Sequence, residues 1–150
     1  MELTLIRTDS ENEGFRSLVV LLDRELAIRD GDDHAFFAQF NKIQNIRNVV
    51  VAVLDGVPVG CGAFKEYEPG VMEVKRMFVQ PEIRGKGIAG KILRELEEWM
   101  MELGYKRWIL ETGEKQPEAI RLYSKSGYTR IPNYGQYADV ATSVCFEKRF

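Results

Sequence analysis

Three glycines within six positions form the part of the sequence that most clearly predicts a ligand. The stretch "RGKGIAG" directly precedes residues with helical spacing, and it contains Gly85, Gly87 and Gly90. Arg84 and Lys86 add positive charge beside the glycines. Glycine lets the backbone approach a ligand closely, and the unpaired N–H groups at the start of a helix bind anions. The turn is therefore predicted to hold a pyrophosphate, although a basic, solvated connection without a ligand would have the same composition.

More than one cofactor carries a pyrophosphate, so the glycine turn alone leaves the cofactor open. Its GxGxxG spacing occurs in dinucleotide-binding folds, and Glu111 follows about 20 residues later, where such folds place a ribose-binding acid. In those folds, however, the strand runs almost directly into the first glycine, whereas residues 80–84 intervene here. Antiparallel strands are predicted before the turn and little chain follows Glu111, so a dinucleotide is the less favoured cofactor.

Other residues could do chemistry, but the sequence around them gives little support. His34 is the only histidine and has no partners at metal-ligand spacing, so no metal site is predicted. Cys61 could carry an acyl group, yet the sequence places no base beside it, and strand cysteines are generally packing residues. A group of acidic residues could attract a cationic amine, although a solvated acidic loop is favoured. These residues are Asp23, Glu25, Asp30, Asp32 and Asp33.

Hydrophobic periodicity predicts strands and helices in the order β-α-α-β-β-β-α-β-α-β. Asp55-Gly56 between two β-rich runs is the strongest hairpin signal, and these runs form an antiparallel meander with the next strand. A further short strand is considered at 128–131. The predicted strands are 2–7, two runs within 48–67, 71–79, 106–112 and 142–150, and the predicted helices are 15–28, 35–43, 88–103 and 116–127.

This order predicts an α/β (α+β) fold in which helices flank a mixed, mostly antiparallel central sheet. A chain of 150 residues is the usual size of one globular domain. No repeat, low-complexity segment or linker divides it. We therefore expect residues 1–150 to form a single domain.

The composition disfavours several classes of protein. A net charge of −2 gives no global attraction to nucleic acid or to an anionic membrane. No apolar stretch approaches the ~20 residues that cross a bilayer, and the N-terminus lacks a signal-peptide pattern. Cys61 and Cys145 show no CxxC or metal-ligand spacing, so both are expected to be reduced. We expect a cytoplasmic protein without a nucleic-acid or membrane partner.

Two motifs resemble those of the GNAT superfamily of N-acetyltransferases. "RGKGIA", from Arg84 to Ala89, is similar to the R/Q-x-x-G-x-G/A signature that binds the pyrophosphate of acetyl-CoA. "AIRLYSKSGY", residues 119–128, is similar to the second motif, A-x-x-L/F-Y-x-x-x-G-F/Y. The strand "EVKRMFV" before the first motif and the long helix after it also agree with the family. The resemblance covers about residues 48–131 and implies a GNAT-like fold.

The resemblance implies an N-acetyltransferase that uses acetyl-CoA and no metal. The acetyl group would pass to a primary amine of a small molecule or peptide by direct attack in a ternary complex. A homodimer is considered because relatives commonly dimerise. Two alternatives stay open: a catalytically silent acyl-CoA-binding module on the same fold, and, less favoured, a dinucleotide-binding enzyme.

The resemblance also implies roles for individual residues. A lysine-like amine has a pKa near 10.4 and must lose a proton before attack. Glu73 lies where histone acetyltransferases of the superfamily carry their glutamate base, although a strand glutamate in a cross-strand ion pair is an equal alternative. Tyr123 is the implied general acid for the leaving thiolate, favoured over an aromatic that only packs, and the Val79 N–H is implied to polarise the thioester carbonyl. The implied cofactor contacts are Met77, Phe78, Val79, Arg84, Gly85, Lys86, Gly87, Ile88, Ala89, Gly90, Gln116 and Tyr123.

Two local features bear on this assignment. Gln116 stands where many family members have asparagine, so the amide is kept with a longer reach. Strict alternation along 71–79 would place Glu73 on the same face as Lys75, Met77 and Val79. Family members bulge this strand, however, which would change the face.

The acceptor side is less marked in the sequence. Arg76 could bind an acceptor carboxylate bidentately. Tyr134 and Tyr137 follow the second motif closely and could border the acceptor pocket. A stacked surface turn explains the two tyrosines equally well.

Overall fold

The computed structural model describes residues 2–31 and 46–150, and the helix predicted over 35–43 falls outside them. The side chain of Asn12 caps the first helix by accepting a hydrogen bond from the Phe15 N–H. Asp55 and Gly56 have φ of 49° and 84°, as a type I′ hairpin turn requires. The helices are α1 (Glu13–Asp30), α3 (Ile88–Glu102) and α4 (Pro117–Lys125), the strands are β1 (Leu3–Thr8), β2 (Asn48–Leu54), β3 (Val57–Glu68), β4 (Val71–Val79), β5 (Arg107–Gly113), β6 (Thr129–Ile131) and β7 (Ser143–Arg149), and short 3₁₀ turns cover Pro81–Ile83 and Gly135–Tyr137.

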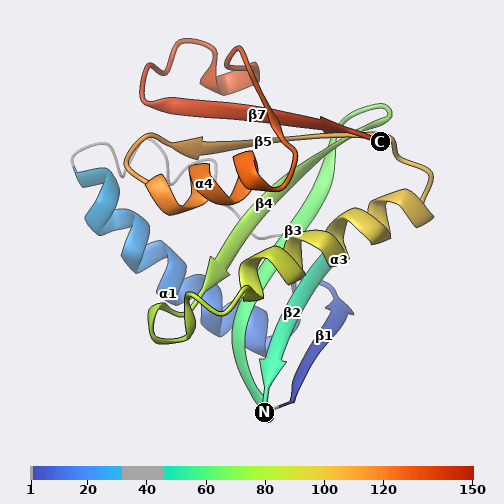
Figure 1. Ribbon diagram of the computed structural model, residues 1–150, viewed down its shortest axis with the longest axis vertical. Coiled ribbons are helices and arrows are strands. Elements are labelled where there is room, and N and C mark those ends of the chain that lie inside the picture. Colours follow the sequence, from blue (N-terminus) through green and yellow to red (C-terminus); the bar gives the residue numbers. More distant parts are fainter. Residues whose placement is uncertain (1, 32–45) are drawn as a thin grey trace.

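The strands of the described residues form one seven-stranded sheet in the order β1-β2-β3-β4-β5-β7-β6. All neighbouring strands pair antiparallel except β4 and β5, whose parallel pairing covers only Val71–Glu73 against Arg107–Ile109. Beyond these residues β4 and β5 separate towards their C-terminal ends (Figure 1). The predicted mixed, mostly antiparallel sheet is confirmed, and it is open between β4 and β5.

Helices cover both faces of the sheet. α3 and α4 pack on one face and α1 packs on the other, so each face has its own apolar core (Figure 1). Gly62 of β3 lets α3 approach, because a Cβ there would lie only 2.9 Å from Leu96 Cδ1 and 2.5 Å from Met77 Sδ. No helix within residues 2–31 or 46–150 is long and apolar enough to span a bilayer. α3 contributes Ile88, Ile92, Leu93, Leu96 and Met100 to the first core, and α1 contributes Phe15, Leu18, Val19 and Leu22 to the second.

A bulge interrupts β4 shortly after it leaves β5. In the register of β3 with β4, Arg76 and Met77 together oppose Gly62 alone. Arg76 has φ of 60°, a left-handed conformation that residues other than glycine rarely adopt. Such a bulge bends the strand and changes the direction of the side chains that follow.

The bulge overturns the face assignment from strict alternation. Met77 and Val79 pack against the core beneath α3. Before the bulge, however, the residue directly before Glu73 and the residue directly before Lys75 belong to this core. Successive side chains of a strand point to opposite faces, so Glu73 and Lys75 lie on the other face of the sheet. Arg76 also faces that side, where it forms an ion pair with α1. Strict alternation, which would place Glu73 and Lys75 on the face of Met77 and Val79, therefore does not hold, and the strand carries a bulge as the family resemblance implied.

Candidate active site

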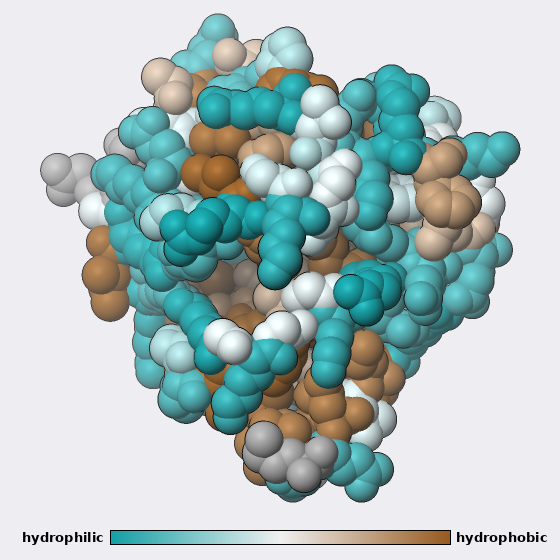
Figure 2. Space-filling view, in the orientation of Figure 1, coloured by the Kyte–Doolittle hydropathy of each residue, from teal (hydrophilic) through white to brown (hydrophobic). Residues whose placement is uncertain are grey.

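A cavity of about 340 Å³ lies where β4 and β5 separate. Its walls come from the second half of α1, the C-terminal half of β4, the glycine turn, the end of β5 and α4. Figure 2 shows that the molecule is hollowed near the middle of the face on which α3 and α4 lie, with hydrophilic side chains around the hollow. Most of the predicted cofactor contacts line this cavity: Met77, Phe78, Val79, Arg84, Gly85, Gly87, Ile88, Ala89, Gly90, Gln116 and Tyr123.

The glycine turn presents the N-terminus of α3 to the cavity. Gly85 and Gly87 have φ of 84° and 77°, which glycine adopts without strain, and Gly87 is the N-cap of α3. α3 has neither a side-chain cap nor an acidic residue in its first turn. Its first N–H groups have no intrahelical acceptor, so they suit an anion such as a pyrophosphate. Lys86, the remaining predicted contact, is exposed and does not line the cavity.

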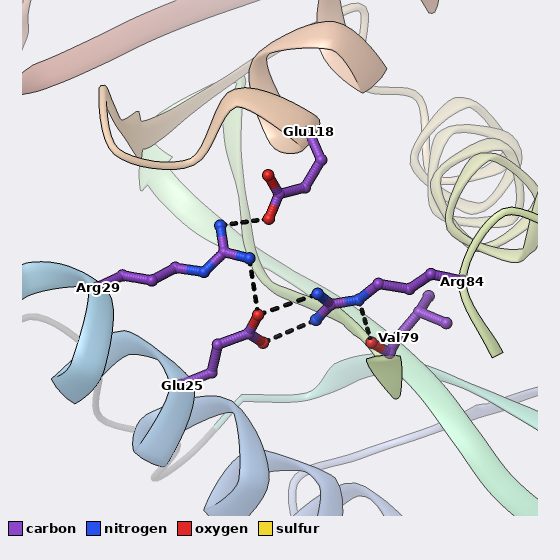
Figure 3. A network of polar contacts seen from close by, with 5 residues as sticks. All are labelled: Glu25, Arg29, Val79, Arg84 and Glu118. Atoms are coloured by element: carbon purple, nitrogen blue, oxygen red, sulfur yellow. Dashed lines mark hydrogen bonds and ion pairs between the residues drawn. The ribbon is translucent and has the colours of Figure 1, made fainter. Parts of the chain in front are cut away.

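The Arg84 side chain is held by α1 and β4. Its Nη1 and Nη2 donate to the two carboxylate oxygens of Glu25 at 3.0 and 2.7 Å, and its Nε donates to the Val79 carbonyl at 2.8 Å (Figure 3). Burial acts to raise the pKa of Glu25, but Arg84 and Arg29 outweigh burial and lower it. The hydrogen bonds to Glu25 raise the pKa of Arg84. For the predicted phosphate contact, the Arg84 guanidinium must leave Glu25, whereas the backbone N–H groups of the turn need no such change.

Glu25 and Arg84 belong to a network that joins three walls of the cavity. Arg29 of α1 pairs with Glu25 at 2.9 Å and also with Glu118 of α4. Figure 3 shows these four charged side chains in sequence from α4 through α1 to the segment before α3. Glu25 and Arg84 are 59 residues apart, so no local pattern in the sequence indicates this network.

The backbone of Val79 faces the opening in the sheet. Val79 lies directly opposite Gly60 in the antiparallel register, and the next residue, Gln80, donates its N–H to the Val59 carbonyl at 2.9 Å. In an antiparallel ladder this pattern makes Val79 and Gly60 a non-hydrogen-bonded pair, so the N–H and C=O of Val79 point away from β3. The Arg84 side chain reaches this carbonyl. The Val79 N–H therefore points into the opening, where it can donate a hydrogen bond to a ligand.

Tyr123 is buried in the α4 wall of the cavity. Its ring packs between those of Tyr128 and Phe146, with centroids 5.6 and 6.0 Å away. Burial, and then the negative charge of Glu111, raise the pKa of the Tyr123 hydroxyl. A phenol with a raised pKa stays protonated at neutral pH and can donate its proton. Gln116, the N-cap of α4, lies on the same wall.

Glu73 lies behind the cavity wall, since it is 3% exposed and does not line the cavity. Tyr134 donates its hydroxyl to Glu73 Oε2 at 2.6 Å, and Lys75 Nζ lies 3.7 Å from Glu73 Oε1. Burial and the charge of Glu73 raise the pKa of Tyr134, which keeps this proton on the phenol. Glu73 thus has an ion-pair partner on its own strand. A base role for Glu73 requires a water or a side chain to connect it to the cavity.

Two charged residues that were not predicted as acetyl-CoA or acceptor contacts also lie at the opening. Lys75 and Glu111 line the cavity together with Arg76 and Tyr137, the two predicted acceptor-side residues that reach it. Ser143 donates its hydroxyl to Glu111 at 2.7 Å. Burial lowers the pKa of Lys75 and raises that of Tyr137. The sequence singled out Glu111 only as the ribose-binding acid of a dinucleotide fold, and no local pattern marks Lys75 as a residue of the cavity.

The residues that could have carried other chemistry are engaged elsewhere or lie outside the description. Burial raises the pKa of the Cys61 thiol to about 12 despite the nearby Arg76, so Cys61 stays protonated at neutral pH. Asp23 and Glu25 of the acidic group each pair with an arginine. His34 falls within 32–45, outside the described residues, as do Asp32 and Asp33.

Comparisons with known proteins extend over nearly the whole chain. The model of the Acetyltransferase (GNAT) family matches residues 15–128. The IAA acetyltransferase of Azospirillum brasilense is 33% identical over 97% of this chain and 97% of its own. A Klebsiella pneumoniae structure described as an acyl-CoA N-acyltransferase matches with a TM-score of 0.82 and 26% identity over 98% of this chain and 97% of that one. The PaiA N-acetyltransferase of Thermoplasma acidophilum, in complex with coenzyme A, shares the fold with a TM-score of 0.74 and 17% identity over 100% of both chains.

Proposed function

Because this chain belongs to the acetyltransferase (GNAT) family and is an acyltransferase, we propose that it moves an acetyl group from acetyl-CoA to a primary amine. The acceptor is a small molecule or a peptide, and its amine attacks the thioester directly in a ternary complex. One observation carries the proposal: the opening between β4 and β5 brings the Val79 backbone, Tyr123 and the glycine turn to one cavity.

The residues around the cavity suit acetyl-CoA. The backbone N–H groups of Arg84 to Gly90 hold the pyrophosphate, and this binding does not depend on the Arg84 side chain. Met77 to Val79 pair with the pantetheine arm as an added strand would, on the side of β4 that β5 has left. The amide of Gln116 on the α4 wall offers a further polar contact to the arm.

The side chains divide the chemistry between them. Glu73 takes the proton of the acceptor ammonium through a water, which leaves a neutral amine able to attack. The Val79 N–H donates to the thioester oxygen as negative charge develops there. Tyr123 gives its proton to the sulfur as the new C–N bond forms and the C–S bond breaks, so that CoA leaves as a thiol. The nitrogen of the new amide then releases its extra proton, which passes through water to the Tyr123 phenolate and restores the phenol. Acetyl-CoA supplies only the acetyl group.

Two measurements together test the proposal. Calorimetry should show saturable binding of acetyl-CoA at tens of micromolar or below, and a panel of primary amines should contain members that release the CoA thiol. Binding without release from any amine would instead identify a silent acyl-CoA-binding module. Binding of NAD in place of acetyl-CoA would identify a dinucleotide enzyme. The cytoplasmic location and the homodimer stay predictions.

A further inference from the structure

Arg76 is a buried cation next to the residues proposed to hold the thioester arm. Only 2% of its side chain is exposed, and it lines the cavity directly before Met77. The bulge brings it there, because its left-handed φ of 60° accompanies the change of face in β4. Strained backbone in a residue other than glycine persists only where the surrounding structure imposes it, and it concentrates at functional sites.

The Arg76 guanidinium has fewer partners than it can bind. Arginine carries five N–H donors and stays charged throughout the physiological pH range. Nη2 donates to Asp23 Oδ1 at 2.6 Å, whereas the buried Nε has no hydrogen-bond partner within the described residues. The Asp23 side chain is 50% exposed, so water shares its carboxylate. A buried guanidinium with one such partner is well placed to gain a second carboxylate.

We propose that Arg76 binds a carboxylate of the acceptor, so that the acceptor is a small molecule carrying both a primary amine and a carboxylate, such as a free amino acid. This inference rests on the proposed acetyl transfer and names its acceptor class. Arg76 and Val79 are three residues apart, at most about 10 Å along the strand, because the bulge at Arg76 shortens the path. This separation suits a short acceptor whose amine reaches the thioester while its carboxylate stays at the guanidinium.

The unpaired donor of Arg76 favours this acceptor over a simple cationic amine. Lys75, beside Arg76, is also buried and lines the cavity, and it lies 3.7 Å from Glu73 Oε1. The neighbouring carboxylates also accept hydrogen bonds, Glu73 from Tyr134 and Glu111 from a serine hydroxyl. A carboxylate of the acceptor can accept a hydrogen bond from the Arg76 Nε, which has no partner within the described residues, whereas an ammonium has no acceptor atom to offer it.

The test compares free amino acids with their own carboxamides in the thiol-release assay. Each carboxamide keeps the size and the amine of its amino acid but lacks the negative charge. For the best amino acid, wild-type protein should show a kcat/KM about 10-fold or more above that of the carboxamide. Arg76→Gln should remove most of this preference by lowering kcat/KM for the amino acid alone. The pKa of the amine differs between the amino acid and its carboxamide, but each compound has the same pKa in the assays of both proteins. A change in the ratio of the two kcat/KM values between wild type and Arg76→Gln therefore reports the Arg76 side chain alone.

Asp23→Asn is the matched control, because it removes the partner of the same guanidinium without altering the cavity wall. If Arg76 serves only to tie β4 to α1, both variants lower thermal stability and leave the ratio unchanged, which overturns the inference. If Arg76 binds a carboxylate, Asp23→Asn keeps or strengthens the preference. Should Arg76→Gln fail to fold, Arg76→Lys keeps the charge without the planar fork and should still reduce the ratio.

The outcomes for the two proposals can be told apart. Thiol release from wild-type protein that is as fast with carboxamides or simple amines as with amino acids overturns the carboxylate site and leaves acetyl transfer standing. Absence of thiol release from every amine in the panel overturns both proposals.

Discussion

Tyr123 and Tyr134 show how the surroundings of a side chain decide its use at this cavity. Both are phenols whose pKa is raised by burial and by a nearby carboxylate. The Tyr134 proton is committed to Glu73 at 2.6 Å, and Tyr134 does not line the cavity. Tyr123 does line the cavity, at the wall opposite the β4 backbone. Of these two phenols, only Tyr123 is placed to donate a proton to a ligand.

Tyr123→Phe should therefore slow turnover far more than it weakens binding. We expect kcat to fall by about 100-fold, a usual effect of removing a general acid, because the thiolate must then leave unprotonated. The dissociation constant of acetyl-CoA should change by less than about 3-fold, since a phenyl ring of the same shape remains. Thiol-release kinetics and calorimetry measure the two quantities.

Tyr128→Phe is the control for this substitution. Tyr128 contacts the Tyr123 ring but donates its hydroxyl to Glu97 at 2.8 Å, and it does not line the cavity. The variant should lose stability, because Glu97 loses a partner, and should keep kcat. Equal kcat values for Tyr123→Phe and wild type would remove the acid role from Tyr123.

At the level of elements, the glycine turn and the first turn of α3 act as one unit. Gly85 and Gly90 both line the cavity, yet their backbones differ. Gly85 has φ of 84°, whereas Gly90 has ordinary helical geometry with open space at the position of a Cβ. Substitution by alanine therefore separates the conformational role of glycine from its role in leaving room for a ligand.

We expect Gly85→Ala and Gly90→Ala to have opposite effects on stability and the same effect on binding. Gly85→Ala forces alanine into the left-handed region and should lower the free energy of unfolding by about 1 kcal/mol. Gly90→Ala improves helix propensity and should raise it by up to about 1 kcal/mol. Both should weaken acetyl-CoA binding, because a methyl group then occupies the anion site. Thermal unfolding and calorimetry test this, and full affinity in Gly90→Ala would place the pyrophosphate elsewhere.

The elements themselves were largely predictable from the sequence, because local signals define them. Asp55-Gly56 specifies a hairpin turn, and the apolar stripe of α3 has helical spacing over its whole length. The bulge at Arg76 has no such local signal, because it depends on how β4 packs between β3 and two helices. The pairing of Arg84 with Glu25 is equally hidden, since it joins residues 59 positions apart. The pairing of Arg84 with Glu25 was therefore missed, and strict alternation alone gives Glu73 and Lys75 the wrong face.

Across the whole molecule, the network of Glu25, Arg29, Arg84 and Glu118 connects elements that the sheet separates. It joins α1, which packs on one face, to α4, which packs on the other, at the cavity where the sheet is open. Arginine remains charged at all relevant pH values, so the pH dependence of its pairs with Glu25 follows the Glu25 carboxylate. The lowered pKa of Glu25 makes this dependence testable.

The stability of the molecule should depend on pH through Glu25. A carboxylate whose pKa is lowered by folding stabilises the folded state above its unfolded pKa of about 4.3, and this contribution is lost as the pH falls through the folded pKa. Glu25→Gln should lower the free energy of unfolding by about 1 kcal/mol at pH 7, since the pair is partly solvated. The difference from wild type should shrink as the pH falls below about 4. Urea denaturation across this pH range measures it.

Glu11→Gln provides the matched control for the pH series. The Glu11 side chain is 82% exposed and pairs with Arg16 at 3.3 Å, so its removal should change stability little at any pH. A difference between Glu25→Gln and wild type that stayed constant from pH 7 to pH 3 would contradict the role given to the Glu25 carboxylate.

The opening between β4 and β5 also makes the ligand part of the fold. Within the described residues, β5 pairs with β4 only as far as Glu73, so the rest of that edge of β4 has no strand partner from β5. On the proposed function, the pantetheine arm completes this edge and stabilises the folded state by mass action. At a concentration 100 times the dissociation constant, the gain is about 2.7 kcal/mol. The supply of acetyl-CoA in a cell would then govern how much intact, protease-resistant enzyme accumulates, as well as how fast that enzyme works.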